Sequence, residues 1–243
     1  MRLRLIRNAT MTVDLGGTRL LVDPMFDPAG ARPPVADTVP ERRNPLVELP
    51  EPPAALLEGV DAVLLTHLHQ DHFDPAAAGT IGDRLPVWCQ PEDVEALREA
   101  GIGDLHPVEE RATVGAVEVT RVGAQHGFGD VAEALGPVSG YVLQADGETL
   151  YLASDTVFYD GVQDVLARVS PQVVVVNAGG ASFVNTERII MDLDDVQAVR
   201  ACAPDTTCVA VHLEAINHCP LTRDQLRAVD GVVAPDDGQV LEL

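Results

Sequence analysis

The chain has 243 residues, of which 46% are hydrophobic and 22% charged, so it can bury a substantial core and has the composition of a globular protein. Its 38 acidic residues against 16 arginines give a formal net charge of −22, which argues against nucleic acid or an anionic membrane surface as a general partner. The absence of lysine also excludes a Schiff-base lysine and a phosphate-loop lysine.

Short strands and one long loop make up the first part of the chain. Alternating apolar residues predict an antiparallel meander of strands over residues 3–6, 11–15 and 19–22. Residues 27–53 are rich in proline and charge and are predicted to form a long surface loop. The pattern after this loop predicts a strand at 61–65, a helix at 75–80, a strand at 86–89 and a helix at 92–100.

The second part of the chain repeats this order of meander and strand-helix units. Its patterns predict strands at 115–122, 138–145, 148–153, 173–176 and 208–211, and helices at 161–168, 192–202 and 221–228. We therefore expect two similar halves whose sheets face each other between outer helices. No linker separates them, so residues 1–243 are expected to form a single domain.

The N-terminus and the cysteines bear on the compartment. Residues 1–7 alternate like a strand and lack the apolar core and cleavage site of a signal peptide, and no stretch is long enough to span a membrane. The four cysteines include no Cys-x-x-Cys pair, so we expect them to be reduced and buried. These features predict a cytoplasmic protein.

The most informative segment is Thr-His-Leu-His-Gln-Asp-His-Phe-Asp at residues 66–74, directly after an apolar strand. Because His67 and His69 are two residues apart, their imidazoles lie on one face of an extended chain and can bind one ion. Asp71 and His72 follow in the turn and are free to serve a second ion. Imidazole and carboxylate together suit zinc, iron or manganese, whereas solvated turn residues rarely cluster in this way.

Three further polar residues follow predicted strands. His126 lies in a glycine-bounded loop after the strand ending at 122, Asp155 follows the strand ending at 153, and His212 follows the strand ending at 211. Alone, each is explained equally well as a turn, cap or core residue. Together, at strand ends where sheet proteins place their chemistry, they are favoured as metal ligands.

The motif His67-Leu68-His69-Gln70-Asp71-His72, followed in order by His126, Asp155 and His212, resembles that of the metallo-beta-lactamase-fold hydrolases. The resemblance is greatest to the ascorbate-6-phosphate-lactonase-like branch. Residues 20–24 also resemble the family's early strand, which ends in a structural aspartate, here Asp23. The resemblance implies an α/β fold, a four-layer αββα sandwich with a dinuclear metal site at the sheet edges.

The resemblance also implies a ligand set for two divalent metal ions. His67, His69 and His126 would hold one ion and Asp71, His72 and His212 the other, with Asp155 bridging them. Zinc is the first choice of metal, with manganese and iron as alternatives. His218 is the alternative to His212 as last ligand; otherwise it would support the site or act as an acid near the leaving group, and a plain cap of the following helix is an equally good explanation.

The activity implied is hydrolysis of a small-molecule ester, lactone or phosphate-containing metabolite by a metal-activated hydroxide. Asp71, Asp155 and His218 are the catalytic candidates, with the carboxylates orienting the hydroxide or accepting its proton. The alternatives are a small-molecule phosphodiesterase and an iron-dependent redox enzyme on the same fold. The partner expected is the small substrate, with neither nucleic acid nor membrane, and the chain could form a homo-oligomer.

Residues outside the ligand set are candidates for the substrate pocket. Asn177 follows a buried strand and could donate to an oxyanion, although an ordinary turn is at least as good an explanation. Three loop aromatics could wall the pocket, and three arginines of the long loop could grip an anion. These candidates are Phe128, Tyr159 and Phe183, and Arg32, Arg42 and Arg43.

Overall fold

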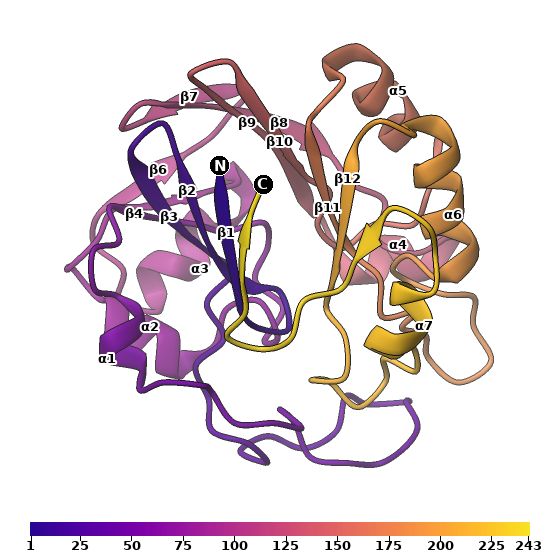
Figure 1. Ribbon diagram of the computed structural model, residues 1–243. Coiled ribbons are helices and arrows are strands. Elements are labelled where there is room, and N and C mark those ends of the chain that lie inside the picture. Colours follow the sequence, from indigo (N-terminus) through magenta and orange to yellow (C-terminus); the bar gives the residue numbers. More distant parts are fainter.

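The computed structural model describes all 243 residues, which form two facing seven-stranded sheets with helices on their outer sides (Figure 1). The first sheet has the order β14-β1-β2-β3-β4-β5-β6, with β1 at Arg2–Arg7, β2 at Thr10–Leu15, β3 at Thr18–Val22, β4 at Ala62–Leu64, β5 at Val87–Cys89, β6 at Leu105–Pro107 and β14 at Val240–Glu242. The second has the order β13-β12-β11-β10-β9-β8-β7, with β7 at Arg111–Val114, β8 at Val117–Gly123, β9 at Ser139–Ala145, β10 at Glu148–Leu152, β11 at Val173–Asn177, β12 at Thr207–Val211 and β13 at Val232–Val233.

The helices are short and lie outside the two sheets. Those of the first half are α1 at Pro53–Leu56, α2 at Pro75–Ile81 and α3 at Val94–Glu99, the last preceded by the 3-10 turn η1 at Pro91–Asp93. Those of the second half are α4 at Gly129–Leu135, α5 at Asp160–Val169, α6 at Leu193–Cys202 and α7 at Arg223–Arg227. None of these helices is long and apolar enough to span a membrane.

The period-two pattern of the strands accounts for the layers. In β11, Val173 and Val175 point into the core between the sheets, whereas Val174 and Val176 pack against α5 and α6 on the outer side. The outer face of the first sheet is covered in the same way by apolar residues of α1, α2 and α3. The expected four-layer αββα sandwich is therefore confirmed.

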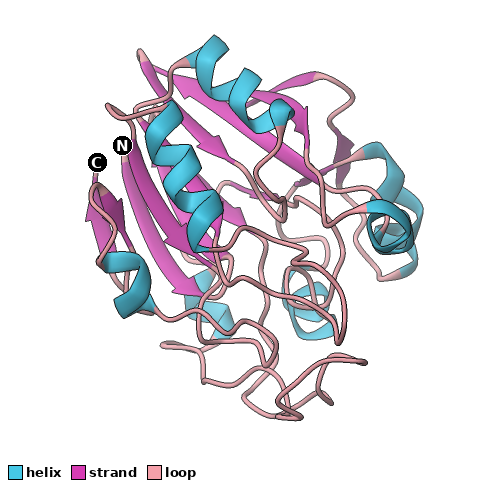
Figure 2. Ribbon diagram, turned by 90° about the vertical axis from the view of Figure 1, so that its right-hand side faces the viewer, coloured by secondary structure: helices cyan, strands magenta, loops and turns pink.

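In both sheets, the strand ends that precede the site residues lie at the same end of the sandwich. The strands β3 to β6 run parallel to one another, as do β10 to β13. Their carboxyl ends meet at the end of the molecule where the long loops gather (Figure 2). This is the end of a sheet at which α/β proteins bind their ligands.

Several elements differ from the sequence prediction. The predicted strand 115–122 begins only at Val117, because Gly115 has a φ of 59° and forms the turn that follows β7. The helix α4 was not predicted, since it buries none of its side chains and carries little apolar signal. The cysteines are free, as expected, but Cys202 is exposed and the other three are buried.

Asp93, at the junction of η1 and α3, gives a pH-dependent contribution to stability. Burial raises the pKa of Asp93 to about 6 from 3.8, and its Oδ2 accepts no hydrogen bond. A raised aspartate pKa means that the folded state holds the proton more tightly, so this contribution is present below about pH 4 and is lost as the pH rises through 6.

The substitution Asp93→Asn removes the free-energy cost of keeping an ionised carboxylate buried at neutral and alkaline pH. We expect the variant to exceed the wild type in free energy of unfolding by about 1 kcal/mol at pH 8, after allowance for solvent screening, with no gain at pH 4. Urea denaturation at both pH values measures the difference. The exposed residue Glu99, on the same side of the molecule in α3, provides the control Glu99→Gln. A gain that is equal at both pH values would show that ionisation of Asp93 is not its cause.

Candidate metal centre

The turn after β4 is held in one conformation by its own hydrogen bonds. The backbone N–H and the hydroxyl of Thr66 donate to the two carboxylate oxygens of Asp23, at 2.8 and 2.7 Å. At the other end of the turn, Asp74 Oδ1 accepts from the N–H of Ala77 and caps α2, so Asp74 is a helix cap. The intervening histidines are therefore presented on a short, fixed turn at the end of β4.

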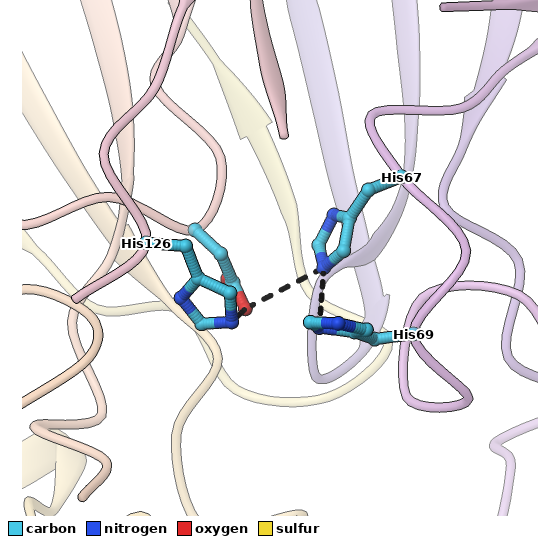
Figure 3. A group of neighbouring side chains, drawn as sticks. His67, His69 and His126 are labelled. Atoms are coloured by element: carbon cyan, nitrogen blue, oxygen red, sulfur yellow. Dashed lines mark hydrogen bonds and ion pairs between the residues drawn. The ribbon is translucent and has the colours of Figure 1, made fainter. Parts of the chain in front are cut away.

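The first group of donors consists of His67, His69, His126 and Asp155, whose ligand atoms all lie within 4.8 Å of one another. His67 Nε2 is 3.1 Å from His69 Nδ1, and Asp155 Oδ2 is 3.8 Å from His67 Nε2 and 3.6 Å from His126 Nε2 (Figure 3). Donor atoms around a tetrahedral zinc ion with bonds of about 2.0 to 2.1 Å lie about 3.3 Å apart. These four side chains therefore surround a space of the right size for such an ion.

Backbone carbonyls orient two of these imidazoles. His69 donates from Nε2 to the carbonyl of Leu135 at 3.1 Å, and His126 donates from Nδ1 to the carbonyl of Ile189 at 2.8 Å. The other nitrogen of each ring is then left as a lone-pair donor facing the group. Burial lowers the pKa of His126 and holds the pKa of His67 well below its ordinary value, which favours the neutral form that binds metal.

The second group consists of Asp71, His72 and His212. Asp71 Oδ2 lies 3.1 Å from His212 Nε2. His72 donates from Nδ1 to Asp23 at 2.8 Å, which leaves its Nε2 buried without any hydrogen-bond partner. A buried nitrogen without a partner is costly unless something else fills its lone pair, and a cation at this point does so.

Asp155 lies between the two groups. Its Oδ2 is 3.3 Å from His72 Nε2, in addition to its contacts with the first group, and its Oδ1 is 3.9 Å from His212 Nε2. The Asn177 side chain donates to Oδ1 at 2.6 Å and fixes the carboxylate. The sequence left Asn177 open as either a donor to an oxyanion or an ordinary turn residue; in the structure its amide orients Asp155.

The charges of the centre favour a cation. Although burial raises them, the pKa values of Asp71 and Asp155 lie well below the ordinary range because His72 and His212 are close. Burial lowers the pKa of His72, but the carboxylates of Asp155 and Asp23 raise it to about 10. The same negative potential that attracts protons to this position attracts divalent cations, so the donor set fits two such ions in chemistry as well as in distance.

A cavity of about 330 Å³ opens directly over both groups. Site residues including Asp71, His126 and Asp155 form its floor. Its walls include apolar side chains from four separate segments, Val35, Leu135, Phe183, Ile189, Ile190 and Ile216. The cavity therefore has the size and lining to accept a small molecule with apolar parts above a polar floor.

Some of the pocket residues expected from the sequence lie elsewhere. Phe183 lines the cavity, but Tyr159 donates its hydroxyl to the carbonyl of Gly123, and Phe128 packs beneath the guanidinium of Arg188. Among the three loop arginines, Arg32 lines the cavity but pairs with Asp27 at 3.0 Å, and Arg43 donates to two loop carbonyls. Arg32 and Arg43 thus tie the loop to residues 27–31, whereas the side chain of Arg42 is exposed.

His212 and His218 occupy different positions. His212 follows β12 and belongs to the second group, and Cys219 Sγ lies 3.4 Å from its Nδ1. His218 belongs to neither group but lines the cavity, where its buried Nδ1 has no partner. The sequence did not single out Cys219 or Thr66, because neither residue type at these positions differs from ordinary core and turn residues.

Comparisons with known proteins agree with this geometry. Residues 18–213 match the family described as "Beta-lactamase superfamily domain". The chain is 31% identical to the UPF0173 protein YddR of Bacillus subtilis, over 98% of both chains, and 26% identical to a UPF0173 metal-dependent hydrolase of Azorhizobium caulinodans, over the full length of both. Among solved structures, the isothiocyanate hydrolase from Delia radicum gut bacteria is 34% identical, with a TM-score of 0.94 over 100% of this chain and 99% of that one.

Proposed function

The chain belongs to the beta-lactamase superfamily and is a metal-dependent hydrolase, and we propose that it acts on a small, largely apolar molecule at an uncharged electrophilic carbon. The observation that carries this proposal is the cavity, in which a floor of histidines and carboxylates faces walls of aliphatic and aromatic side chains. Such walls bind an apolar substituent and leave the reactive group of the substrate against the metal centre.

We propose that His67, His69 and His126 hold one ion and Asp71, His72 and His212 the other, with Asp155 bridging them. Zinc remains the first choice because the donors are imidazole and carboxylate at tetrahedral spacing. When bound, the ions lower the pKa of a water molecule and polarise the bond under attack. Asp71 and Asp155 are kept ionised by their histidine neighbours, so their carboxylates orient that water and its proton.

We assign the proton transfer to the leaving group to His218. Its ring lines the cavity and lies 6.4 Å, centroid to centroid, from the ring of Phe183. An imidazole in the cavity wall can accept a proton from the attacking water and pass it to the departing nitrogen or oxygen.

Isothiocyanates, esters and lactones are the substrate classes that this arrangement favours. Attack of one water molecule on the central carbon of an isothiocyanate, followed by cleavage of the carbon–nitrogen bond with protonation of the nitrogen, yields an amine and carbonyl sulfide. The similarity to an isothiocyanate hydrolase makes this the first reaction to test. Phosphate-containing metabolites and phosphodiesters are second candidates, because Arg32 in the cavity wall is already paired with Asp27.

A substrate panel with the metal-loaded protein tests this proposal. We expect turnover of an aryl or alkyl isothiocyanate or of a small ester or lactone, and little turnover of phosphodiesters. A panel hydrolysed only at phosphodiesters would overturn it. The variant His218→Gln is expected to lose at least about a hundredfold in kcat on alkyl esters but less than about tenfold on nitrophenyl esters, whose leaving group needs no proton. Equal losses on both would remove His218 from this role.

A further inference from the structure

We propose that Asn217 is a positioning residue that sets the shape of the substrate cavity by holding one of its walls in place. That wall belongs to residues 32–44 of the long loop, which we call the cap segment. The inference rests on the proposed function only in treating the cavity as the substrate site. Neither the metal groups nor the catalytic candidates include Asn217.

Asn217 contacts the cap segment through its whole amide group and its backbone. Its Oδ1 accepts from the N–H of Val35 at 3.2 Å and from Asn44 Nδ2 at 2.7 Å. Its Nδ2 donates to Thr38 Oγ1 at 2.8 Å and to the carbonyl of Pro40 at 2.9 Å. Its backbone N–H donates to Asn44 Oδ1 at 2.8 Å. All four hydrogen-bonding positions of the amide are thus filled by one segment.

The other contacts of the cap segment hold it near its ends and at single points between them. Within residues 32–44 only Thr38 and Asn44 are buried, and both are partners of Asn217, whereas Val39 is 68% exposed. Near its ends, Arg32 and Arg43 bond to residues 27, 30 and 31, and Arg32 forms a bridge with Asn44. Between the ends, Val35 packs partly against an apolar cluster, and the carbonyl of Asp37 accepts from the N–H of Val184. A segment without an apolar core keeps its conformation mainly through its hydrogen bonds, so the buried amide of Asn217 determines where it lies.

The position of Asn217 connects the cap segment with the chemistry. Asn217 directly precedes His218, and Val35, whose N–H donates to Asn217, lines the cavity. Asn217 therefore fixes two things: the cavity wall that would contact the apolar part of the substrate, and the chain next to the proposed proton donor. Loss of this amide should loosen substrate binding more than it slows the chemical step, because the metal groups do not depend on it.

Two independent readouts test the inference. The cap segment contains the exposed residues Arg42 and Arg43, so trypsin cleavage there reports its opening without any need for activity. We expect Asn217→Ala to be cleaved at these sites at least about tenfold faster than the wild type. We expect KM on the best substrate of the panel to rise at least about tenfold, with kcat within about threefold and metal content unchanged.

Asn44→Ala removes two of the same bonds from the side of the cap segment, one to the amide oxygen and one to the backbone N–H of Asn217. Because Asn44 itself lines the cavity, trypsin cleavage is the decisive readout for this variant. The variant should reproduce both effects, and the double variant should add little to either single one. The exposed amide of Gln163 in α5 supplies the control Gln163→Ala, expected to match the wild type. Unchanged cleavage rates and KM in both asparagine variants would overturn the inference. Faster cleavage without turnover of any substrate would support the role of Asn217 in holding the cap segment and count against the proposed function instead.

Discussion

Alanine at position 67 is expected to remove one of the two proposed metal ions and to lower kcat/KM by more than about a hundredfold. His67 is 2% exposed and its Nε2 faces His69 and Asp155, so no other side chain can take its place in the first group. Loss of a residue that merely orients a ligand lowers metal affinity or activity about 10- to 100-fold, and loss of a ligand itself should lower them further. Metal analysis of protein purified without chelator, together with the kinetics of the best panel substrate, measures both quantities.

The control for this variant is His106→Ala. Of the seven histidines, His106 is the one outside the site. Its ring stacks on Trp88, and it pairs with the exposed residue Asp104. The His106→Ala variant should change neither metal content nor activity. A His67→Ala protein that keeps its full metal content and turnover would contradict the assignment of the first group.

Asparagine at position 155 is expected to weaken both ions together. The two oxygens of Asp155 face His67, His126 and His72 on one side and His212 on the other. The substitution keeps the size of the side chain and an oxygen for Asn177 to donate to, but it removes the negative charge that the two groups share. We expect metal content below one ion per chain and a loss of activity at least as large as that of His67→Ala.

The comparison between the two variants distinguishes a dinuclear centre from a single site. If the centre is dinuclear, His67→Ala retains up to one ion in the second group, whereas Asp155→Asn retains less. Asp164→Asn, at an exposed position of α5, controls for the change of charge. Identical stoichiometries of one ion in the wild type and in the Asp155→Asn variant would refute the bridging role.

The sequence predicted which polar residues the fold brings together better than it predicted their surroundings. His67, His69, Asp71 and His72 lie close together in sequence, and His126, Asp155 and His212 follow strands whose apolar pattern is clear, so the fold brings them together as expected. The similarity to metal-dependent hydrolases confirms the expected enzyme class. The lactonase-like branch, the metal and the oligomeric state stay predictions.

What the sequence could not predict are contacts made by the backbone and between distant segments. The backbone carbonyls of Leu135 and Ile189 orient two imidazoles. Because every residue has a backbone carbonyl, the residue type at these positions gives no indication of this role. Asn217 and Asn44 are 173 positions apart, and no local pattern links them. The short strands β6, β13 and β14 were missed because two or three residues are too few to show a period.

The division of the donors between the two sheets has a mechanical consequence. His67, His69, Asp71 and His72 come from the first half of the chain, whereas His126, Asp155 and His212 come from the second. Ions bound at this seam act as cross-links between the sheets, and because they bind only the assembled sandwich, their binding free energy adds to that of folding. Chelation should therefore loosen the two sheets from each other at the loop end, and neither half of the chain could carry the reaction alone.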